Sequence, residues 1–148
     1  MPDFESILDK PIGSIEAPAP KPVGTFVGVL MGVPEIQKIG KDEHQVVDFK
    51  VKLLSAEADV DADQLAAAPP LNEWPQFQLR RWANSEDAIY SLQEWLKNTL
   101  DCTEGTPIRQ ALAETAGKQL KVTMKNRPGT NRDGQPAIFF EVGDTAHI

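Results

Sequence analysis

The chain has 148 residues, of which 41% are hydrophobic and 25% charged, and its formal net charge is −7. This length suits one domain with its own core, and no apolar run approaches the roughly 20 residues that span a membrane. The single cysteine, Cys102, cannot form an internal disulfide, and the acidic start MPDFESILDK lacks the basic flank of a secretion signal. We therefore expect an intracellular, non-secreted protein without a transmembrane segment.

Residues 1–23 are expected to form an extended N-terminal arm. Phe4, Ile7 and Leu8 could form one apolar stripe between acidic residues, and the proline-rich spacer EAPAPKP follows at residues 16–22. An acidic and apolar segment on a spacer is typical of a short motif that binds a partner protein. A disordered terminus and an arm packed on its own domain are the alternatives, and such an arm would also suit a homo-oligomer.

Residues 24–148 are expected to form a single domain of five strands. Side chains alternate between two faces along a strand, and this alternation predicts strands at residues 24–33, 45–54, 75–82, 118–126 and 136–142. Residues 55–75 form an acidic, alanine- and proline-rich excursion, expected to be a loop or a short helix. Ser85 is a suitable N-cap for a helix that contains Trp95 on its apolar stripe, and a second short helix ends at Gly117.

This order of elements predicts a mostly β protein with one or two helices. Five strands with a helix between the third and the fourth match the OB-fold, a five-stranded Greek-key barrel. The ligand face of that fold involves its second and third strands, and the loop between its last two strands borders this face.

Basic residues gather on these same elements, although the chain is acidic overall. Residues 118–132 contain no acidic residue, and screening over roughly 8–10 Å lets a local patch outweigh the net charge at contact. Backbone phosphates need cations, and bases need flat side chains on which to stack. The nucleic-acid-binding candidates are Lys50, Lys52, Arg80, Trp82, Lys121, Lys125, Arg127 and Arg132. The competing interpretation is that these side chains only form the solvated faces of strands.

Three passages carry a resemblance to a known class of proteins: GTFVGVLMGVPE, FQLRRWANSEDAIYSLQEWL and GKQLKVTMKNRPGTNRDGQPAIFFEV. Over roughly residues 24–143 the chain resembles phage-encoded OB-fold proteins that bind single-stranded DNA. The resemblance implies a role in phage replication or recombination within the host cytoplasm. Many such proteins end in an acidic tail with a terminal aromatic residue, whereas this chain ends in GDTAHI.

Catalytic and metal-binding patterns are missing from the sequence. Acidic residues alternate from Glu57 to Asp63, but Gln64 stands where a calcium loop needs glycine, and Pro70 replaces its last glutamate. His44 and His147 do not form a pair with ligand spacing. We therefore expect no enzyme activity, no metal and no cofactor.

The sequence thus predicts a sequence-tolerant single-stranded DNA-binding protein that does not bind membranes. The main alternative is a non-enzymatic virion structural or auxiliary protein, or a protein-interaction module on the same fold. A weaker alternative is an inhibitor of a host nucleic-acid enzyme that uses the acidic residues from Glu57 to Asp63.

Overall fold

The computed structural model of the protein describes residues 8–9, 11–12 and 21–148. Two expected partner-binding residues, Phe4 and Ile7, lie outside these residues, whereas the third, Leu8, is 83% exposed. The strands are β1 (Gly24–Leu30), β2 (Glu35–Ile39), β3 (His44–Ala56), β4 (Phe77–Trp82), β5 (Gln119–Thr130) and β6 (Pro136–Ala146). The helices are α2 (Ala62–Ala67), the 3-10 helix η1 (Leu71–Glu73), α3 (Glu86–Leu100) and α4 (Ile108–Ala113).

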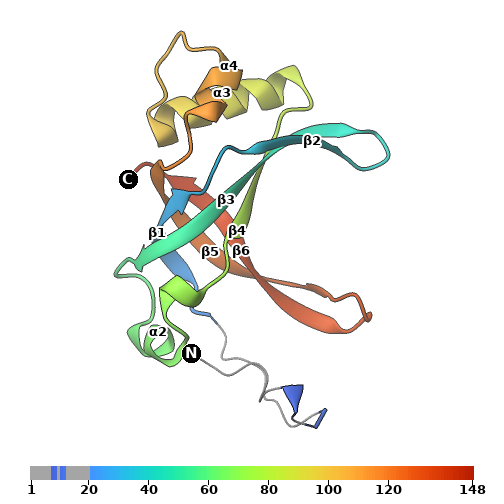
Figure 1. Ribbon diagram of the computed structural model, residues 1–148, viewed down its shortest axis with the longest axis vertical. Helices are drawn as coiled ribbons and strands as arrows, with labels where there is room; N and C mark the ends of the chain where they lie inside the picture. Colours follow the sequence, from blue (N-terminus) through green and yellow to red (C-terminus); the bar gives the residue numbers. More distant parts are fainter. Residues whose placement is uncertain (1–7, 10, 13–20) are drawn as a thin grey trace.

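The protein is mostly β, as predicted, and its six strands form one antiparallel sheet. β3 is the longest strand and lies at the centre, where it pairs with β1, β2 and β4. β1 also pairs with β5, and β5 pairs with β6. Figure 1 shows α3 and α4 at one end of the sheet, α2 at the opposite end, and the β5–β6 hairpin extending away from the sheet. No helix in the described part of the chain is long and apolar enough to cross a membrane.

The sheet differs from the expected five-stranded barrel in two ways. It has a sixth strand, because β2 continues along the same edge of β3 after β1 is interrupted: Leu30 lies opposite Val51, and Glu35 lies opposite Asp48. The short and exposed β2 sequence EIQKI gives little alternation signal of its own. The sheet is also not closed, since β4 pairs with β3 and β6 with β5, but β4 and β6 share no ladder.

Side chains from one face of the sheet form the core. Phe26, Phe49 and Val122 are at most 1% exposed, and the ring of Phe49 lies 5.2 Å from that of Trp95, centroid to centroid. Gly28 allows β1 to approach β3 closely, because a Cβ atom there would lie 2.7 Å from a methyl group of Val51.

Helix α3 forms as the sequence predicts. The Ser85 hydroxyl accepts a hydrogen bond from the Ala88 N–H at 3.1 Å, and this bond caps the helix N-terminus. Leu92, Trp95 and Leu96 are buried along one face of the helix, and Trp95 donates its indole N–H to the Thr145 hydroxyl at 2.7 Å. The helix therefore covers one end of the core and is tied to β6.

Candidate nucleic-acid interface

Three predicted residues share the outer face of the β3–β4 pair. Arg80 and Trp82 alternate along β4, and Lys50 lies opposite Gln78 on the same face. Lys50 and Arg80 are exposed, and Trp82 is 48% exposed. The rings of Trp82 and His44 form a T-shaped pair, with centroids 5.9 Å apart. About half of the indole therefore remains open to a ligand.

Arg80 is held by a carboxylate. Its Nε and Nη2 donate to the two carboxyl oxygens of Asp48 at 2.7 and 3.1 Å, and Gln37 donates to the same carboxylate. The hydrogen-bonded guanidinium holds the pKa of Asp48 below its ordinary value of 3.8. Because Asp48 stays charged, it both orients Arg80 and offsets part of its positive charge.

The Lys52 ammonium is occupied by backbone carbonyls. It donates to the carbonyl oxygens of Leu71 at 3.4 Å and Asn72 at 3.1 Å, and also to that of Trp74. These carbonyls belong to η1 and the residue that follows it, and the Leu71 carbonyl also accepts from the Trp74 N–H at 3.1 Å. The structure therefore gives Lys52 a role in anchoring the long excursion to β3.

The three predicted cations of β5 lie on one face of the strand: Lys121, Lys125 and Arg127. Their surroundings differ. Lys121 forms an ion pair with Glu57 at 3.8 Å. Lys125 is exposed, and its stem covers Gly143 on the neighbouring strand β6. Arg132 is exposed in the turn between β5 and β6. These cations therefore do not all converge on the outer face of the β3–β4 pair, which we call the Arg80 surface.

Arg127 is the β5 residue that joins the Arg80 surface. Its Nε donates to Glu141 at 2.8 Å, and its guanidinium lies 5.0 Å from the centre of the Phe139 ring. Phe139 in turn covers Gly129, where a Cβ atom would lie 2.7 Å from the ring. Phe139 is thus held on two sides and keeps 37% of its surface exposed.

A groove of about 620 Å³ lies between β4 and β6, where the sheet is not closed. We call it the seam groove. It is lined by Phe77, Gln78, Leu79, Arg80, Arg81, Arg127, Phe139, Phe140, Glu141, Val142 and Gly143. Three guanidinium groups and one carboxylate therefore line the groove beside three phenylalanine rings. A second hollow contains Trp82 and shares Arg80 and Arg81 with the groove, so the surface continues from Phe139 to Trp82.

Alternation along β4 assigns Arg81 and Phe77 to the inner face, and neither was a predicted site residue. They reach the groove because β4 is an open edge, where inner-face side chains are not covered by a next strand. Arg81 lies 4.9 Å from the centre of the Trp95 ring, and its partial burial lowers its pKa from the ordinary value. The adjacent aromatic pair Phe139–Phe140 was the available signal for the β6 wall, since neighbouring residues face opposite sides of a strand.

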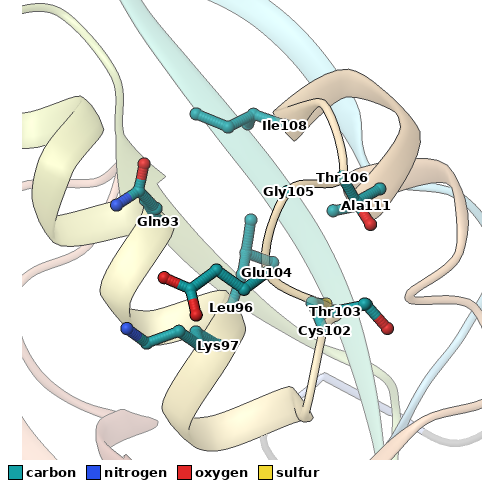
Figure 2. A pocket seen from close by; sticks show the side chains of 10 residues that line it. All are labelled: Gln93, Leu96, Lys97, Cys102, Thr103, Glu104, Gly105, Thr106, Ile108 and Ala111. Carbon is teal, nitrogen blue, oxygen red and sulfur yellow. The ribbon is translucent and has the colours of Figure 1, made fainter.

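A smaller hollow of about 170 Å³ lies between α3, α4 and the loop that joins them. Figure 2 shows Lys97 of α3 pointing toward Glu104 of the loop, with Gln93 above them and Cys102 to their right. Burial raises the pKa of the Cys102 thiol above its ordinary value of 9.0, so this thiol is a weak nucleophile. Among the described residues, no three histidine, cysteine or acidic side chains are grouped to hold a metal ion.

Comparison with known proteins adds one partial match. No protein-family model matches the chain. Over 67 residues, 45% of this chain, it is 34% identical to YbfG of Escherichia coli (strain K12), described only as an uncharacterized protein. The matched stretch spans 31% of YbfG, so this similarity places the chain in no family and implies no activity.

Proposed function

We propose that this protein binds single-stranded DNA without strong sequence preference, in phage replication or recombination. The observation that carries the proposal is the seam groove. It places the guanidinium groups of Arg80, Arg81 and Arg127 beside the half-exposed ring of Phe139. Cations that follow a phosphate backbone and rings on which bases stack are the two requirements of sequence-tolerant single-strand binding.

The strand pairing supports an OB-like reading of the sheet. If β1 and β2 are counted as one interrupted strand, the pairs β1–β3, β3–β4, β1–β5 and β5–β6 follow the order of a Greek-key barrel. The missing pair is β4–β6, where Phe77 and Phe140 approach to 5.4 Å between ring centroids. We therefore propose a barrel that is open along this seam, with the groove between the expected third strand and the last hairpin.

In this mechanism Arg80 and Arg127 contact phosphates while Phe139 and Trp82 stack on bases. Each of the two arginines already has a carboxylate partner, Asp48 or Glu141. A phosphate would share the guanidinium with that partner, since each guanidinium has five N–H donors. We expect binding of moderate affinity that weakens steeply as salt increases, because phosphate contacts release counterions.

The direct test is fluorescence anisotropy with a labelled oligothymidine of about 30 nucleotides, at two salt concentrations and with duplex as competitor. Phe139→Ala should weaken binding by roughly 5- to 150-fold, because stacking contributes about 1–3 kcal/mol per base. Ile138→Ala is the matched control, since Ile138 is its neighbour on the hairpin, points to the other face and is 73% exposed. Arg127→Gln should reduce the salt slope by about one phosphate contact. Absence of binding at low salt would refute the proposal.

A second candidate function is a protein-interaction or virion auxiliary module. The observation that favours it is that carboxylates offset several of the cations: Asp48 pairs with Arg80, Glu141 with Arg127, and Glu57 with Lys121. Surfaces with paired charges suit protein partners better than a polyanion. A defined oligomer in light scattering, together with no affinity for single strands, would favour this candidate.

A further inference from the structure

The arm joins the domain close to the seam groove. Pro22 is buried, and the Lys21 ammonium lies 5.9 Å from the centre of the Trp74 ring. The Trp74 ring in turn lies 5.8 Å from that of Phe140, which lines the groove. The chain therefore enters the fold one aromatic ring away from the groove wall.

The far end of the arm has the chemistry that complements this groove. Its sequence at residues 3–9 is DFESILD, which contains three acidic and three large apolar residues and no basic residue. The groove offers three guanidinium groups and three phenylalanine rings beside one carboxylate, that of Glu141. Leu8 and Ile12 are 83% and 106% exposed, so these two apolar side chains of the arm are available to a binding surface.

The arm is long enough to reach the groove of its own domain. About 13 residues separate Leu8 from Lys21, and a proline-rich spacer extends by about 3.1 Å per residue, which gives a reach of roughly 40 Å. β4 has 6 residues, so the groove wall is only about 20 Å long at 3.3 Å per residue. The spacer therefore does not prevent binding within one chain.

We propose that residues 3–9 bind the seam groove of their own domain and compete there with single-stranded DNA. The acidic side chains pair with Arg80, Arg81 and Arg127, and the apolar side chains pack on the phenylalanine rings. Docking of the arm depends only on the groove, whereas the competition rests on the proposed function. A tethered segment has an effective concentration on the order of millimolar, so a segment with a dissociation constant of about 0.1 mM would weaken strand binding roughly tenfold.

Docking is tested without DNA by paramagnetic relaxation in the full-length chain. A nitroxide attached to Ser6→Cys, in a Cys102→Ser background, should broaden the amide signals of Arg127, Phe139 and Gly143 at low salt, and 0.5 M salt should reverse the effect. No broadening in the groove would overturn the proposal. Broadening that appears only in mixtures of isotope-labelled and spin-labelled chains would also overturn it, because the arm would then bind a second copy.

Competition is tested by removing acidic charge from the arm. The double variant Asp3→Asn/Glu5→Gln should bind oligothymidine about 5- to 10-fold more tightly than the control Asp63→Asn/Glu104→Gln. The control removes the same charge from exposed positions that do not line the groove. Equal affinities of the two variants would overturn the competition. If the arm docks but neither variant binds DNA, the proposed function fails while the docking stands.

Discussion

Replacing Lys52 tests whether this lysine stabilises the fold or binds the single strand. Lys52→Met keeps the apolar stem and removes the ammonium, which donates to the carbonyls of Leu71, Asn72 and Trp74. Hydrogen bonds from a charged group contribute about 1.5–3 kcal/mol. Water replaces part of this contribution, because Lys52 is only half-buried and Asn72 is exposed. We expect a loss of about 1–2 kcal/mol in the free energy of unfolding.

The assay is urea and thermal unfolding followed by tryptophan fluorescence. A loss of this size should lower Tm by about 3–6 °C in a chain of this length. Lys50→Met is the matched control: Lys50 is two residues away on the same strand face and is exposed, so its stability should change by less than about 0.5 kcal/mol. Affinity for oligothymidine should show the reverse pattern, falling for Lys50→Met only.

The opposite result would refute this reasoning. If Lys52→Met were as stable as Lys50→Met and also lost affinity for the single strand, the ammonium of Lys52 would face the ligand and not the η1 carbonyls. The assignment of Lys52 to the anchoring of the excursion would then be wrong.

Two further predictions concern ionisation. The hydrogen bond from Arg80 lowers the pKa of Asp48, so the stability that this pair contributes is complete above the ordinary pKa of 3.8 and is lost as pH falls through the lower folded value. Asp48→Asn should make the free energy of unfolding depend less on pH in that range, and an unchanged pH dependence would contradict the pairing. Because burial raises the pKa of Cys102, alkylation by iodoacetamide should be slow at pH 8 in the folded protein and should reach half its maximal rate only above the ordinary pKa of 9.0. Unfolding in urea should restore the rate of a free thiol, and equal rates in both states would argue against a buried thiol.

The sequence by itself determined the local structure. Alternation of apolar and polar residues placed strands over most of β1, β3, β4, β5 and β6, and the Ser85 cap with its apolar stripe placed α3. These features could be predicted because a strand repeats every two residues and a helix every 3.6, so the covered face can be read from neighbours in the chain. The outward direction of Lys50, Arg80 and Lys125 is of this kind.

The tertiary structure decided which of these side chains meet. Arg127 of β5 joins Arg80 at the seam groove because the sheet brings the β5–β6 hairpin next to β4. Lys52, in contrast, is occupied by carbonyls from a segment about 20 residues away. β2 forms because β3 extends beyond β1 and offers it an edge. These outcomes depend on strand register and on the curvature of the sheet, which local periodicity does not encode.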